Sequence, residues 1–94
     1  MPALILEFAS DKPRLVEIQD SILTLVKRHV NLDTNNPIPE PEKVGLFLGE
    51  RQAAVFTYKW RLPLKKRIEE SAIKALETQL SGLEVHKIYI EEST

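Results

Sequence analysis

Apolar and polar positions follow two different periods along this chain. Residues 3–9 (ALILEFA) alternate with the period of a β-strand. In residues 13–30 and 63–80, apolar side chains instead recur every three or four positions, which predicts an amphipathic helix in each segment. Runs rich in aliphatic and aromatic residues predict three further strands, at residues 44–48, 51–60 and 83–90.

Residues with special backbone preferences mark the ends of the predicted helices. Ser10 and Asp11 can cap the first helix through their side-chain oxygens. Pro13 and Pro63 suit the first turn of a helix, where the missing N–H has no intrahelical partner anyway. Gly82 follows the last apolar residue of the second helix and is predicted to end it.

The connections complete the predicted fold. Gly49-Glu50 suits a two-residue hairpin turn between the second and third strands. Residues 31–43 contain Pro37, Pro39 and Pro41, prolines at alternate positions, and are predicted to be an irregular connection. Residues 91–94 are predicted to form a frayed acidic tail. The order β-α-β-β-α-β predicts one α+β domain over residues 1–94. Its expected architecture is a ferredoxin-like sandwich, with a four-stranded antiparallel sheet and both helices on one face.

The predicted hairpin divides the side chains of the sheet between two faces. With this turn, Leu46 pairs with Ala53, and the aromatic residues of segment 51–60 fall on the opposite face. The aromatic face has the larger area to bury, so we expect it to contact the helices. Monomers seldom expose large apolar patches, so we expect the other face to bind a partner or a second copy of the chain. The candidate residues of this apolar face are Ile5, Val44, Leu46, Leu48 and Val55. A register shifted by one residue, or a tail folded over the sheet, would remove this surface.

Charge is distributed unevenly along the chain, although its 94 residues carry a net charge of only −1. Residues 51–68 hold six basic side chains and no acidic one, whereas the rest of the chain holds seven basic and 14 acidic ones. The segment is therefore +6 and the remainder −7, a separation that influences which partners are attracted. The candidate basic patch consists of Lys59, Arg61, Lys65, Lys66 and Arg67.

Three of these cations are predicted to lie in the first turns of the second helix, at residues 65–67. Each cation there opposes the helix dipole by about 0.3–1 kcal/mol. Pairing with Glu69 or Glu70 returns only about 0.2–0.5 kcal/mol per pair. Because the placement is slightly unfavourable, we expect the patch to bind an anion, with an acidic protein surface favoured over nucleic acid. An ordinary solvated charged surface is the alternative.

Binding of nucleic acid (RNA or single-stranded DNA) or of a phosphate through the basic segment 59–67 is the main alternative function. The element order and the basic, aromatic third strand invite comparison with the RNA-recognition motif, in which aromatic side chains of the sheet stack on bases. Ala53 and Val55 occupy the positions of those aromatic residues in the third strand, and Ile5 occupies the corresponding position in the first. The stacking platform is therefore missing, and a net charge of −1 is atypical of duplex binders.

The sequence contains no recognisable catalytic or metal-binding constellation. It has no cysteine, which excludes disulfide bonds, thiolate ligands and a Cys nucleophile. His29 and His86 stand apart in the sequence without a third ligand. We therefore expect no enzyme activity, no metal and no cofactor.

The apolar run near the N-terminus is also short, about six residues against the roughly 20 of a membrane-spanning helix. We therefore expect no membrane partner and a cytoplasmic location. The predicted function is that of a small non-enzymatic interaction, regulatory or assembly domain. It would bind an acidic protein, or a second copy of itself as a dimer, through the apolar sheet face and the basic strand–helix junction.

Overall fold

Four strands and two helices follow one another in the predicted order β-α-β-β-α-β. The computed structural model describes residues 2–11, 13–35, 37–48 and 54–92. The elements are β1 (Pro2–Ser10), α1 (Leu15–His29), β2 (Glu42–Leu48), β3 (Ala54–Pro63), α2 (Glu70–Leu80), a short 3₁₀ helix (Ser81–Leu83) and β4 (Val85–Glu92). The predicted α+β class with a four-stranded antiparallel sheet and two helices is confirmed.

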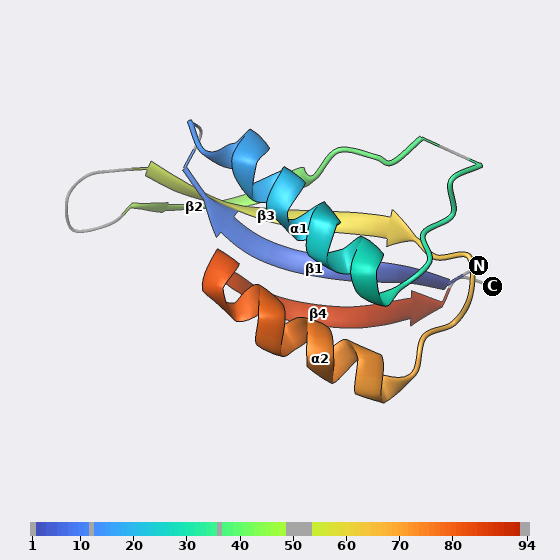
Figure 1. The fold of residues 1–94 in the computed structure, drawn as a ribbon. Helices are drawn as coiled ribbons and strands as arrows, with labels where there is room; N and C mark the ends of the chain where they lie inside the picture. Colours follow the sequence, from blue (N-terminus) through green and yellow to red (C-terminus); the bar gives the residue numbers. More distant parts are fainter. Residues whose placement is uncertain (1, 12, 36, 49–53, 93–94) are drawn as a thin grey trace.

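The strands are arranged in the order β2-β3-β1-β4, and each neighbouring pair is antiparallel. β1 and β3 therefore form the centre of the sheet, and β2 and β4 form its edges. Both helices lie on the same face, with α2 running alongside β4 (Figure 1). We call this the helix-side face and the opposite one the open face.

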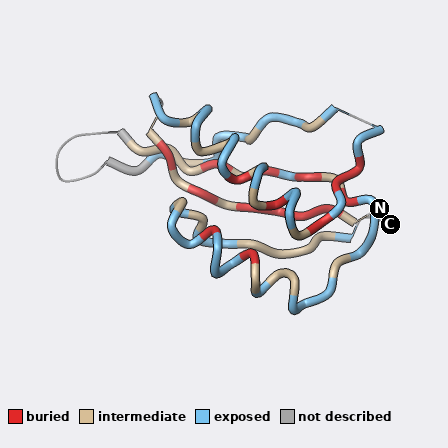
Figure 2. Tube along the Cα trace, in the orientation of Figure 1, coloured by how far each residue is buried: buried red, intermediate tan, exposed pale blue. Residues whose placement is uncertain are grey.

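The core lies between the central strands and the two helices, where the burial is concentrated (Figure 2). Phe8 stacks on Tyr58 with ring centroids 5.5 Å apart, and it contacts Trp60 at 6.2 Å. Tyr58 and Trp60 belong to the same buried cluster as residues of α1 and α2, which confirms the prediction that these aromatic side chains of the third strand face the helices. The buried core side chains are Leu4, Leu6, Phe8, Ile22, Val26, Val30, Leu32, Tyr58, Trp60, Leu62, Leu64, Leu76 and Leu80.

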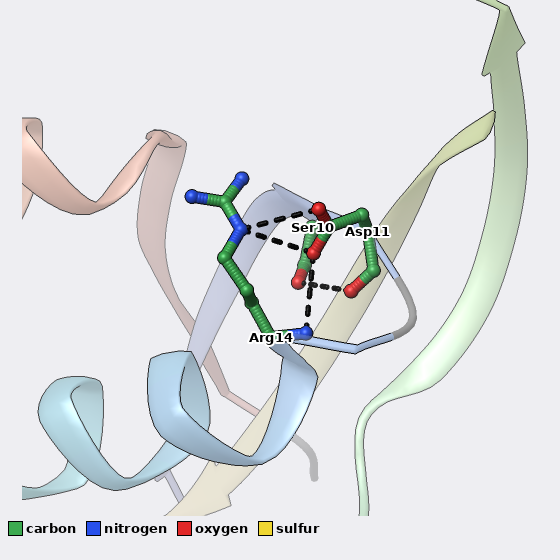
Figure 3. Close-up of polar contacts among 3 residues, drawn as sticks. All are labelled: Ser10, Asp11 and Arg14. Carbon is green, nitrogen blue, oxygen red and sulfur yellow. Dashed lines mark hydrogen bonds and ion pairs between the residues drawn. The ribbon is translucent and has the colours of Figure 1, made fainter. Parts of the chain in front are cut away.

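The segment before α1 uses the predicted polar residues, but in another arrangement. The Asp11 carboxylate accepts hydrogen bonds from the backbone N–H of Arg14 at 3.2 Å and from its Nε at 3.0 Å (Figure 3). Ser10 is buried, and its hydroxyl donates to the Asp11 carbonyl at 2.7 Å. The Asp11 contact thus fixes the turn that precedes Leu15, and no side chain caps α1 itself.

The second helix begins later than predicted. Instead of starting a helix, Pro63 ends β3, and α2 begins at Glu70. The backbone around Leu64 is engaged by other segments: its N–H donates to the carbonyl of Pro2 at 3.0 Å, and the residue forms a bridge with Leu32. These contacts hold it in extended conformation, so a helix cannot start there. Glu69 and Glu70 stand at the true helix start, where acidic residues suit the dipole.

The predicted hairpin register is also wrong. Leu46 pairs with Phe56 rather than with Ala53, and Leu48 pairs with Ala54. Val44 is the extra residue of a β-bulge between Lys43 and Gly45. The shift by three residues moves Leu46 to the helix-side face, since paired residues share a face and successive residues alternate. The predicted turn residues, with Arg51 to Ala53, lie outside the described residues.

The proline-rich connection is irregular in the part that the structure describes, residues 31–35 and 37–41, apart from the bridge at Leu32. It nevertheless contributes to the core. Ile38 packs against the buried cluster. The Trp60 indole N–H donates to the Pro39 carbonyl at 2.6 Å, which satisfies a polar group that would otherwise be costly to bury.

The C-terminal segment differs from the predicted frayed tail. Glu91 and Glu92 belong to β4, where they pair with Ala3 and Pro2. The strand has the predicted length of eight residues but is shifted by two positions, because Leu83 belongs to the 3₁₀ helix and β1 provides partners for Glu91 and Glu92. Residues 93 and 94 of the predicted tail lie outside the described residues.

We predict that Ile22→Ala lowers the free energy of unfolding by about 2–5 kcal/mol, since the side chain is fully buried between α1 and the sheet. Val16→Ala is the matched control, because Val16 lies on the same helix but is 68% exposed. Its effect should stay within about 0.5 kcal/mol. Urea unfolding followed by circular dichroism measures both, and equal midpoints for the two variants would contradict the assigned helix face.

Candidate interaction surface

The open face carries charged residues where the sequence predicted an apolar surface. On it, Ile5 lies between Arg61 of β3 and Tyr89 of β4. Glu7 lies between Lys59 and Lys87 in the same way, and the Lys87 ammonium is 3.7 Å from the Glu7 carboxylate. Long charged side chains can cover apolar surface with their aliphatic parts. This arrangement agrees with the complete burial of Ile5.

The candidate residues of the apolar face are not brought together. Ile5 and Val55 lie on the open face, the first fully buried and the second half-buried. Leu46 belongs to the helix-side face, and Val44 occupies the bulge. Leu48 is the β2 residue paired with Ala54 near the end of the hairpin. The expected continuous apolar face is therefore wrong, and the register explains why.

The candidate basic patch is divided into separate groups. Arg61 forms an ion pair with Glu91, and Arg67 pairs with Glu92 at 3.1 Å. Lys59 lies directly opposite Glu7 on the neighbouring strand. Acidic residues far away in the sequence therefore neutralise much of the charge that is concentrated in segment 51–68.

Lys65 and Lys66 lie elsewhere, between β3 and α2. Together with Lys27 of α1 they line a hollow of about 370 Å³, whose other lining residues are Val30, Asn31, Leu32 and Thr34. Among the described residues, no ion pair involves these three lysines. The sequence predicted that these two lysines would lie in the first turns of the second helix and oppose its dipole. Because they precede α2 instead, that unfavourable interaction does not apply to them.

The β2–β3 hairpin carries an apolar surface that sequence reasoning placed wrongly. β1 ends at Ser10, opposite Phe56, so residues 54 and 55 of β3 continue beyond it with only β2 as a neighbour. The described ends of β2 and β3 consequently project past the helices (Figure 1). We call β2 and residues 54–58 the arm.

Large apolar side chains are exposed on the arm. Leu46 is 60% exposed and Val44 is 50% exposed. The Lys43 ammonium lies 4.0 Å from the centre of the Phe56 ring, in a cation–π contact. Gly45 was the sequence signal for the bulge in β2, because a glycine inside a strand pattern often marks a bulge. A Cβ atom at position 45 would come within 2.5 Å of the Thr57 hydroxyl oxygen.

Buried polar side chains elsewhere have structural roles. Ser10 and Asp33 are buried, and Asp33 accepts a hydrogen bond from the backbone N–H of Asn35 at 3.0 Å.

In residues 2–11, 13–35, 37–48 and 54–92, no cluster of three His, Cys, Asp or Glu could hold a metal ion. Within the same described part, neither helix has the length and apolar composition that crossing a membrane would need.

Comparison with known proteins adds no relative: no protein-family model matches the chain, and the search of curated proteins finds no match. Its function must therefore be argued from the arm, the lysine hollow and the sheet.

We predict a coupling energy of about 0.2–1 kcal/mol between Arg67 and Glu92, the range of exposed ion pairs. The measurement is a double-mutant cycle with Arg67→Ala and Glu92→Ala in urea unfolding. The coupling should shrink at high salt, because exposed charges are screened. The cycle of Lys66→Ala with Glu92→Ala is the control and should give no coupling. If the cycle of Arg67 with Glu92 also gave no coupling energy, the ion pair would not form in solution.

Proposed function

We propose that this chain is a small non-enzymatic domain that binds a protein partner through the arm. The observation that carries the proposal is the exposure of Val44 and Leu46, which lie two residues apart on the edge strand β2. Large apolar side chains in such a place cost free energy in water unless a partner covers them.

The charge next to these residues suggests the chemistry of the partner. Lys43 is exposed and holds its ammonium group over the Phe56 ring, beside the apolar residues. We therefore expect an apolar contact surface that is flanked by acidic groups. Arg61 and Arg67 contribute less to the proposal, because each already pairs with a carboxylate of β4.

We further infer that the architecture is a ferredoxin-like sandwich. The support is the element order β-α-β-β-α-β, the central position of β1 and β3, and the common face of the two helices. This fold hosts many unrelated activities, so it does not itself indicate the partner.

Leu46→Lys tests the proposed binding surface. We expect a partner that co-purifies with the parent chain from its native cells, identified by mass spectrometry, to be lost from this variant. Val16→Lys is the matched control, since Val16 is an exposed aliphatic residue on α1. Both variants should keep the circular dichroism spectrum of the parent. Loss of the same partner from Val16→Lys, or its retention by Leu46→Lys, would contradict binding at the arm.

Binding to a nucleic-acid phosphate is the second candidate, and the convergence of Lys27, Lys65 and Lys66 on one hollow favours it. Against it, the open face of the described central strands β1 and β3 presents no aromatic side chain for base stacking. Position 53, one of those compared with the RNA-recognition motif, lies outside the described residues.

The Lys65→Glu/Lys66→Glu double variant distinguishes the two functions. We expect single-stranded RNA and duplex DNA to bind the parent no more tightly than about 10⁻⁶ M at roughly 150 mM salt, as in non-specific binding. The double variant should unfold at the same urea concentration as the parent, because both lysines are exposed and precede α2. Sub-micromolar nucleic-acid affinity that disappears in the double variant would instead support the phosphate-binding function.

A further inference from the structure

The two edges of the sheet differ in their capacity to accept another strand. An edge strand presents unpaired backbone N–H and C=O groups, and bulges or prolines normally disrupt them. β2 follows the prolines of residues 37–41 and is interrupted by the bulge at Val44. β4 has its irregularity near its start, at His86, and then continues through residues 87–92 without proline or glycine. β4 is thus the more regular edge.

Hydrogen bonds at the two ends of β1 show which groups of β4 are directed outward. The Ala9 N–H donates to the Glu84 carbonyl at 3.2 Å, on the β4 side, and the Pro2 carbonyl accepts from Leu64, on the β3 side. Backbone groups alternate in direction along a strand, so the odd-numbered residues of β1 bond to β4. Their partners are Lys87, Tyr89 and Glu91. The N–H and C=O groups of Ile88, Ile90 and Glu92 therefore point toward the free edge.

This alternation restricts how a second copy of β4 can pair. In an antiparallel dimer, outward-directed residues must face outward-directed residues, so the two-fold axis passes through a residue of the strand. An axis at Ile88 would place Lys87 opposite Tyr89, and an axis at Ile90 would place Ile88 opposite Glu92. Of these three axes, only the one at Tyr89 pairs opposite charges with each other and apolar residues with each other.

With the axis at Tyr89, Lys87 lies opposite Glu91 of the second copy, and Ile88 lies opposite Ile90 of the second copy. Symmetry repeats each pair. Lys87 already pairs with Glu7, and Glu91 already pairs with Arg61. The new contact would join these into a row of alternating charges across the open face, which favours this register over its neighbours.

The helix-side face of the edge also has apolar surface to contribute. Ile88 and Ile90 are half-buried. α2 runs alongside β4, and its Glu77 lines a hollow of about 270 Å³ together with residues 85–88 of β4. Ile73, one helical turn before Glu77, is half-buried as well.

We propose that two copies of this chain pair antiparallel along β4, with Tyr89 on the two-fold axis, to form one continuous eight-stranded sheet. The surface is distinct from the arm, so this dimer and the proposed partner are independent of each other.

Cysteine cross-linking tests the register directly, because the chain has no cysteine of its own. Tyr89→Cys should form a disulfide-linked dimer on mild oxidation, since the two Cα atoms would lie about 4.5 Å apart in a non-hydrogen-bonded pair. Glu91→Cys is the control. In this variant the two introduced thiols, one in each copy, would be four positions out of register. Their Cα atoms would lie roughly 13 Å apart, so they should not cross-link. Equal cross-linking of the two variants would overturn the register.

Charge exchange provides a second test, read by sedimentation at micromolar concentration. The parent should sediment as a dimer, while Lys87→Glu alone and Glu91→Lys alone should shift toward monomer, because each places like charges opposite one another. Mixing these two variants should restore dimers, since each pair of positions 87 and 91 between the two copies then joins opposite charges. A monomeric parent, or a mixture that stays monomeric, would overturn the proposal. So would loss of the dimer in Leu46→Lys, which would place self-association at the arm.

Discussion

The burial of β1 on both of its faces is the constraint on which the rest of the structure depends. Leu4, Leu6 and Phe8 contact the helices, while Ile5 is fully buried on the opposite side. A strand buried in this way needs a neighbour on each side for its backbone groups, and β3 and β4 supply them. The central position of β1 thus fixes the order of the sheet and leaves β2 and β4 at the edges.

β1 also influences where the chain after β3 becomes helical. The Pro2 carbonyl accepts from the Leu64 N–H, and the adjacent Lys65 N–H donates to the Asn31 carbonyl at 3.0 Å. These bonds engage the backbone of Leu64 and Lys65 outside a helix, and the chain remains non-helical as far as Glu69. Three cations that would have opposed a helix dipole therefore precede the helix. Tertiary pairing has overridden the local helical pattern here, so their placement needs no functional explanation.

Local patterns predicted the elements that are stabilised by their own periodicity. The strand at residues 3–9, the helix containing Ile22 and the order of the six elements follow from apolar spacing alone. The register of the hairpin did not follow, because Leu48 pairs with Ala54 and five residues separate them instead of the predicted two. The bulge at Val44, at which only Gly45 hinted, lies farther from the turn and adds one more residue. The candidate apolar face depended on that register, and so Leu46 and Ile5 were assigned to a surface that they do not share.

The charge pattern failed for a related reason. A count along the sequence places six cations together, but the fold brings Glu91 and Glu92 beside two of them. Those acids come from β4, which pairs with β1 rather than with the basic segment, so no local rule connects them. The consequence for function is that charge on the open face of the sheet is arranged in pairs between neighbouring strands rather than in one patch. Paired charges contribute little attraction at long range but discriminate well between registers at short range, because a like-charge pair is unfavourable. A surface of this kind suits the recognition of one defined strand alignment better than the general attraction of a polyanion.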